Sequence, residues 1–153
     1  DINKNRLVPS RFTMLWRLHL NKLSVDVNVQ RVGVSLCSRC ILCQQHREDI
    51  DHLFLSYNTS ASIWNAVSDI FDLHCPQARS VPQLLLALLA VQLSKQVHII
   101  FLVACTEVFQ IIWHIRNQCH HGAPVTNHKN SLSSVLFASQ QANSLHKDCC
   151  HNS

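Results

Sequence analysis

Glycine is almost missing from this 153-residue chain, which contains only Gly33 and Gly122. Phosphate-binding loops and the sharp turn that presents a hydrolase nucleophile need several glycines at fixed spacing, so a P-loop, a dinucleotide fingerprint and a nucleophile elbow are excluded. Proline is scarce too, with four residues. Few turn formers between long apolar stretches favour helices over a many-stranded sheet, and we expect a mainly α fold.

Acidic residues are also few, nine in all against thirteen Lys and Arg. No spaced set of carboxylates resembles the catalytic set of a polymerase or of a ribonuclease H. We therefore expect no catalytic residues, and we predict that the chain is not an enzyme.

Long uncharged apolar runs are lacking as well. The most hydrophobic stretch, residues 84–113, contains Lys95, His98 and Glu107, so we expect no membrane span. No secretory signal opens the sequence, which favours an intracellular, reducing compartment, with the nucleus as one option. There, eight cysteines are better explained as metal ligands or free thiols than as disulfides.

Positive charge is concentrated in the first third of the chain. Residues 1–47 carry a net charge of +6 and the remainder carries −2. Such a basic segment suits an anionic partner, and a solvated surface is the alternative. We expect weak, non-specific contact with RNA or DNA through six of its residues: Arg11, Arg17, Lys22, Arg31, Arg39 and Arg47.

A Cys-x-x-Cys pair, Cys40 and Cys43, precedes His52 by a short segment. Zinc is usually bound by four thiolate or imidazole ligands in a tetrahedron, and a tight Cys-x-x-Cys loop brings two sulfurs to one ion. By spacing alone the signal is weak. We predict metal ligation by Cys40, Cys43 and His52, within a small helical domain that contains a zinc-knuckle-like loop.

Three short segments around these ligands strengthen the interpretation. Residues 38–43, 48–54 and 61–64 read Ser-Arg-Cys-Ile-Leu-Cys, Glu-Asp-Ile-Asp-His-Leu-Phe and Ala-Ser-Ile-Trp. They resemble the zinc-binding domain of plant LINE-type (non-LTR) retrotransposon reverse transcriptases. Residues 9–23 resemble the entry helix of that family, and residues 111–117 its Ile-Trp-x-x-Arg-Asn segment. The resemblance extends over about residues 6–119 and implies an accessory role beside a polymerase.

One position departs from the family pattern. The family has its last Cys ligand where this chain has Tyr57, and a neutral phenol is a poor zinc ligand. The resemblance therefore implies zinc that is weakly bound or lost. Cys37 or His46 could supply the fourth ligand if the loop bends, and water is a further option.

The pattern of apolar residues and helix signals predicts the organisation of the chain. We expect a degenerate zinc-binding domain over residues 1–73, a linker over 74–82, a helical extension over 83–121 and a polar, disordered tail over 122–153. Expected helices begin at Ser10, at Val25 with Gly33 as its stop, and at Asp49 or Asp51 with Phe71 near its end. Two further helices are expected over residues 81–93 and 96–116, and Gly122 ends the second. A weak helix is expected around Leu132, Val135, Leu136 and Ala138.

The three tryptophans are expected in the hydrophobic core. Trp16, Trp64 and Trp113 lie on apolar helical stripes, although their rings could instead stack on bases. Taken together, the sequence predicts a non-catalytic, zinc-binding and nucleic-acid-binding fragment of a retrotransposon polyprotein, with the polymerase part as a possible partner. The alternatives are an inactive retroelement remnant and a helical protein-interaction module that uses the surface of residues 84–93.

Overall fold

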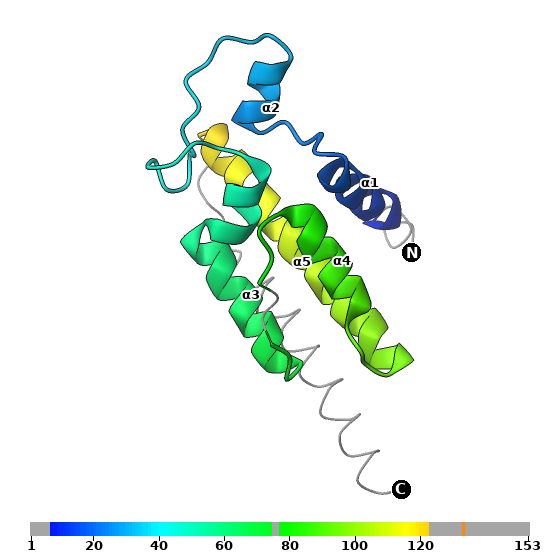
Figure 1. Cartoon of the computed structure of the whole chain (residues 1–153). Helices are drawn as coiled ribbons and strands as arrows, with labels where there is room; N and C mark the ends of the chain where they lie inside the picture. Colours follow the sequence, from blue (N-terminus) through cyan, green and yellow to red (C-terminus); the bar gives the residue numbers. More distant parts are fainter. Residues whose placement is uncertain (1–6, 75–76, 123–132, 134–153) are drawn as a thin grey trace, which may run out of the picture.

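The computed structural model describes residues 7–74, 77–122 and 133. These residues are mainly helical and contain no strand, which confirms the predicted fold class. The predicted tail falls outside them except for residues 122 and 133. The helices of Figure 1 are, in chain order, α1 (Leu7–His19), α2 (Asp26–Arg31), the π-helical turn η1 (His52–Ser56), α3 (Asn58–Ile70), α4 (Val81–Ala90) and α5 (Lys95–His120).

Helix α1 begins at Leu7, so the prediction that Ser10 caps its start is wrong. Pro9 is tolerated inside the first turn, because an N–H at that position has no partner within the helix. The helix buries Met14 and Leu18, which lie one turn apart, and packs against α4 and α5. Trp16 lies on another side of the helix and is 63% exposed, so its predicted place in the core is also wrong.

Helices α2 and α5 both end at the glycines that the sequence marks. Gly33 follows α2 with φ of 92°, and Gly122 follows α5 with φ of 64°. A residue with a Cβ rarely adopts these left-handed conformations, and glycine does so at no steric cost. The predicted stops are therefore confirmed. Helix α4 ends at Ala90, three residues earlier than expected.

The single helix expected to run to Phe71 is divided in two at Tyr57. Its backbone is extended there, with ψ of 129°, and the Tyr57 N–H donates to the carbonyl of His52 at 2.8 Å, which closes the π-helical turn. Asp49 caps this segment, because its carboxylate accepts the His52 N–H at 2.7 Å. The other candidate cap, Asp51, accepts the N–H of Val81 at 2.7 Å and thereby fastens the start of α4.

Helix α5 forms the centre of the hydrophobic core and contacts α1, η1 and α3. Its Phe109 packs against Phe54 and Trp64, with ring centroids 5.5 and 5.1 Å apart, and its Phe101 packs edge-on against Phe71 at 5.1 Å. The predicted zinc-binding domain and helical extension thus share one core.

The length and composition of α5 would also suit a membrane span. The helix has 26 residues, and an 18-residue window in it has a mean hydropathy of 1.6. Central helices of water-soluble cores share these properties, and α5 residues from Val97 to Ile112 belong to the core described above. Among the described residues, α5 is the one helix that meets both criteria.

Candidate metal centre

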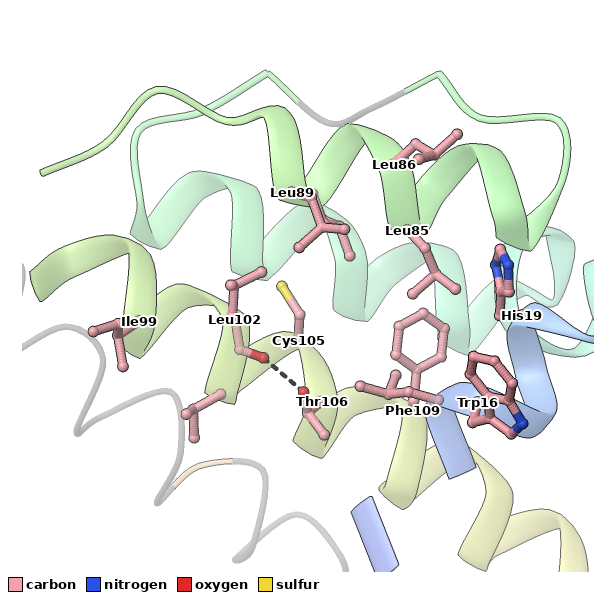
Figure 2. A pocket seen from close by; sticks show the side chains of 13 residues that line it. Trp16, His19, Leu85, Leu86, Leu89, Ile99, Leu102, Cys105, Thr106 and Phe109 are labelled. Carbon is pink, nitrogen blue, oxygen red and sulfur yellow. Dashed lines mark hydrogen bonds between the residues drawn. The ribbon is translucent and has the colours of Figure 1, made fainter. Parts of the chain in front are cut away.

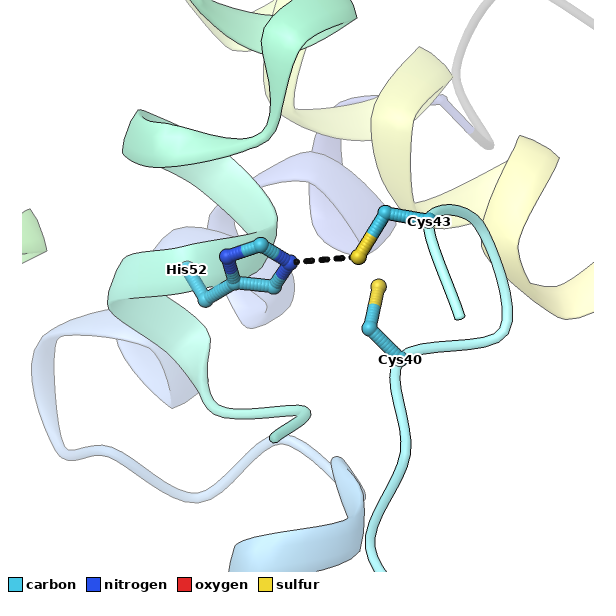
Figure 3. A group of neighbouring side chains, drawn as sticks. All are labelled: Cys40, Cys43 and His52. Atoms are coloured by element: carbon cyan, nitrogen blue, oxygen red, sulfur yellow. Dashed lines mark hydrogen bonds between the residues drawn. The ribbon is translucent and has the colours of Figure 1, made fainter. Parts of the chain in front are cut away.

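Cys40, Cys43 and His52 come together between the loop and η1 (Figure 3). Their two sulfurs and one ring nitrogen all lie within 4.8 Å of one another, and the Cys43 Sγ is 3.3 Å from the Nε2 of His52. Cys40 is fully buried, whereas Cys43 and His52 are partly exposed. The three predicted ligands therefore form one cluster that opens to solvent on one side.

Backbone hydrogen bonds shape the Cys-x-x-Cys loop. The Cys40 N–H donates to the carbonyl of His46 and the Gln44 N–H donates to the carbonyl of Cys40, both at 2.7 Å. Gln44 takes a left-handed conformation with φ of 55°, which reverses the chain directly after Cys43. The closed loop holds both thiols on the side that faces His52 (Figure 3).

The imidazole of His52 is oriented by its own turn. Its Nδ1 lies 3.2 Å from the hydroxyl of Ser56, and this contact leaves Nε2 directed at Cys43. Hydrogen bonding of the second ring nitrogen is the usual device that orients a metal-binding histidine. Ser56 is thus a positioning residue, and sequence reasoning missed it because its role depends on the π-helical geometry of η1.

The two thiols differ in acidity. Burial raises the pKa of Cys40 above its ordinary value. Burial also acts to raise the pKa of Cys43, but hydrogen bonds from the backbone of Gln45 and from His46 and His52 outweigh it and lower the pKa to about 6. Since the thiolate is the form that binds metal, Cys43 is ready to ligate at neutral pH.

The spacing of the cluster fits zinc. Typical Zn–S and Zn–N bonds at a tetrahedral angle separate a sulfur from a nitrogen by about 3.6 Å and two sulfurs by about 3.8 Å. The observed 3.3 Å between Cys43 and His52, and the 4.8 Å limit on all three pairs, are within small side-chain adjustments of these values. Two thiols and an imidazole are also donors that zinc prefers.

The candidates for a fourth ligand lie at different distances from the cluster. His46 is adjacent, with its Nδ1 3.7 Å from the Cys43 Sγ and its ring centroid 5.0 Å from that of His52. It does not lie within 4.8 Å of all three ligand atoms, so it is outside the cluster. Tyr57 presents its ring edge-on to His52, with the centroids 6.5 Å apart. Cys37 is exposed and is not part of the cluster of described residues.

One comparison with known proteins concerns the segment that contains this cluster. Residues 2–64 match the family model described as zinc-binding in reverse transcriptase. The match includes all three clustered ligands and ends at Trp64, so it covers less of the chain than the resemblance noted from the sequence. Neither the curated proteins nor the solved structures gave a match. This part of the chain is therefore similar to the zinc-binding domain of reverse transcriptase.

A buried ion pair connects this zinc-binding segment to α5. Arg116 donates from Nε and Nη2 to the Oε1 of Glu48, and both side chains are at most 5% exposed. Asp26 lies 3.6 Å from the same guanidinium. Burial, and then the charge of Glu48, raise the pKa of the Asp26 carboxyl. The sequence identified Glu48 and Arg116 as parts of separate motifs but gave no sign that they pair.

The predicted nucleic-acid contacts lie mostly at the surface of this segment. Arg17, Lys22, Arg31, Arg39 and Arg47 are all exposed. Arg31 and Arg47 line one hollow of about 330 Å³, which Asp49 and Asp51 also line. Outside that lining, Arg47 donates to the side chain of Gln30 at 2.9 Å. Arg11 belongs to α1, but its side chain lies outside the described part of the chain.

Proposed function

We propose that this chain is a non-catalytic zinc-binding module derived from the reverse transcriptase of a plant LINE-type (non-LTR) retrotransposon. The observation that carries the proposal is the cluster of Cys40, Cys43 and His52 at ligand spacing inside the segment that matches the zinc-binding family. Zinc bound there would act structurally by joining the loop to η1. Since thiol ligands must stay reduced, an intracellular compartment, with the nucleus as one option, suits this role.

His46 is our proposed fourth ligand, in place of the family cysteine at position 57. Its Nδ1 is 3.7 Å from the Cys43 sulfur, close to the separation of two ligands on one zinc ion. The hydrogen bond from Cys40 N–H to the His46 carbonyl fixes this backbone beside the first ligand. The imidazole is exposed, so turning it toward the ion displaces only solvent. An exposed ligand should nevertheless hold zinc less tightly than a complete set with three cysteines.

Competition titration against a zinc indicator, under reducing conditions, tests this assignment. We expect His46→Ala to weaken zinc binding at least about tenfold, which corresponds to about 1.4 kcal/mol. Tyr57→Cys should strengthen it, because a thiolate is a better zinc ligand than a phenol.

Cys37→Ala is the matched control and should bind zinc as the unmodified chain does. Equal affinity in the unmodified chain and in His46→Ala would reject His46 as a ligand. A loss confined to Cys37→Ala would assign the fourth position to that cysteine instead.

We further propose that the module holds RNA or DNA weakly and without sequence preference, as an accessory to a polymerase. The support is the set of exposed basic side chains, among them Arg31 and Arg47 on one hollow. Contacts of such residues with phosphates contribute affinity and carry no sequence information. An inactive remnant of the element remains the alternative, and absence of salt-dependent binding would favour it.

A protein-interaction role is the second candidate function. Leu86 and Leu89 of α4 are 66% and 60% exposed, on the surface that the sequence analysis singled out. Single exposed leucines are common, but these two belong to a larger apolar groove.

A further inference from the structure

An apolar groove runs between α1, α4 and α5, on elements separate from the metal centre (Figure 2). Its volume is about 590 Å³. Five of its lining side chains are unusually exposed for their size, between 48% and 66%: Trp16, Leu86, Leu89, Ile99 and Val103. Among the described residues that line the groove there is no Lys, Arg, Asp or Glu, and the polar ones are His19 and Thr106.

The exposure of these side chains carries a free-energy cost. A large apolar side chain that stays partly in water forgoes part of the stabilisation that full burial would give. A contiguous apolar groove of this kind is typical of a surface that another segment covers. One of the polar side chains in the groove already has a hydrogen-bond partner, because the Thr106 hydroxyl donates to the carbonyl of Leu102 at 2.8 Å.

A segment of the same chain has the matching pattern. Residues 131–143 contain no charged residue, and Leu132, Val135 and Leu136 are spaced to form one apolar stripe on a helix. Ser133, which falls beside that stripe, is helical and exposed. The segment is therefore both uncharged and amphipathic, as an occupant of this groove must be.

The length of chain available allows the segment to reach the groove. The α5 residues that line it run from Ile99 to Phe109, and Phe109 lies about 20 Å along the helix from Gly122. Residues 123–131 can span up to about 30 Å when extended. A helix over residues 132–142 would be about 16 Å long, close to the roughly 15 Å between Ile99 and Phe109.

We propose that residues 132–142 fold back as an amphipathic helix and occupy the groove between α1, α4 and α5 of the same chain. Leu132, Val135 and Leu136 would cover Leu86, Leu89 and Val103. Docked in this way, the segment hides the apolar surface of α4.

Photocrosslinking in the full-length chain tests the proposal. Benzoylphenylalanine replaces Leu86, and crosslinked peptides are identified by mass spectrometry after mixing isotopically light and heavy chains. We expect crosslinks to residues 132–142 within one chain. Leu136→Asp should reduce their yield by about tenfold or more, as loss of one buried leucine contact implies.

Phe137→Ser is the matched control, because Phe137 is in the same segment but lies away from the apolar stripe. It should leave the crosslink yield within about twofold, well below the tenfold effect of a lost buried contact. Crosslinks that join light to heavy chains would show that a second copy occupies the groove and would overturn the proposal. Crosslinks that never include residues 132–142 would also overturn the proposal.

Discussion

The carboxylate of Glu48 connects the loop that carries the candidate metal ligands to the long helix α5. Its Oε1 accepts hydrogen bonds from the Arg116 guanidinium and from the N–H of Asp26, at 3.0 Å from the Arg116 Nε and 3.3 Å from the Asp26 nitrogen. The backbone N–H of Glu48 donates to the Ser38 hydroxyl at 3.0 Å. Glu48 thus connects α2 and α5 through its side chain and the loop through its backbone.

Loss of this carboxylate should destabilise the fold. Glu48→Ala leaves the Arg116 guanidinium buried without its main partner, and breaking a buried pair in this way costs about 3–5 kcal/mol. Urea denaturation followed by circular dichroism measures the change. Asp69→Asn, at an exposed acidic position, is the control and should stay within about 0.5 kcal/mol. A similar small change for Glu48→Ala would show that the pair contributes little.

At the scale of elements, the π-helical turn η1 positions the candidate ligand His52 and the residue after the turn, Tyr57. The wide turn brings Tyr57, the position of the family's last ligand, back beside His52 through the 2.8 Å hydrogen bond to its carbonyl. Such π-helical insertions are frequent at functional sites. The turn also positions Ser56 to contact the Nδ1 of His52.

Ser56→Ala should therefore weaken zinc binding without unfolding the chain. Removing the partner of a metal-binding histidine typically lowers metal affinity by about 10–100-fold. Zinc competition titration measures the effect. Ser62→Ala is the control, since that hydroxyl donates to the carbonyl of Asn58 in α3 and touches no ligand. If both variants bind zinc equally well, Ser56 does not orient His52.

Helix ends were predictable where a local signal marks them. Gly33 and Gly122 mark the ends of α2 and α5, and both helices end there because the left-handed conformation favours glycine. The start of α1 and the division at Tyr57 carry no such signal. The division at Tyr57 is accompanied by a hydrogen bond from the Trp64 indole to the Phe54 carbonyl at 2.8 Å, which sequence periodicity does not reveal.

The ligands of the candidate site were predictable from the sequence, but the contacts that hold the ligand loop in place were not. The Cys-x-x-Cys spacing and the following histidine are a weak signal alone, and the resemblance of the surrounding segments to the zinc-binding domain strengthened the prediction of Cys40, Cys43 and His52. The partner of Glu48 lies 68 residues away, so the pairing depends on how α5 packs. Trp16 was misplaced for a related reason, because helical spacing alone does not tell which of several apolar side chains faces the core.

At the scale of the whole molecule, basic residues and hydrophobic core lie in different regions. Among the described residues, four exposed arginines belong to α1, α2 and the loop (Arg17, Arg31, Arg39 and Arg47) and a fifth, Arg79, precedes α4, whereas the core is centred on α5. This arrangement predicts nucleic-acid binding that involves no apolar contact and falls steeply with salt. On duplex DNA, the log–log slope should be about 0.9 per phosphate neutralised.

Fluorescence anisotropy over a series of salt concentrations measures this slope. Arg31→Ala together with Arg47→Ala should lower both the affinity and the slope, because the two residues line one hollow. Lys95→Ala, an exposed charge at the start of α5, is the control and should change neither. Binding that does not respond to salt would contradict an electrostatic interface.

The central claim is that Cys40, Cys43 and His52 bind zinc, and elemental analysis of the full-length chain tests it most directly. Purified with its thiols reduced, the chain should carry one zinc ion, and Cys40→Ser should carry much less. A chelator should remove the metal while the helical circular-dichroism signal persists, because the core around α5 does not depend on it. Reduced protein that binds no zinc, or binds it equally well as Cys40→Ser, would contradict the account.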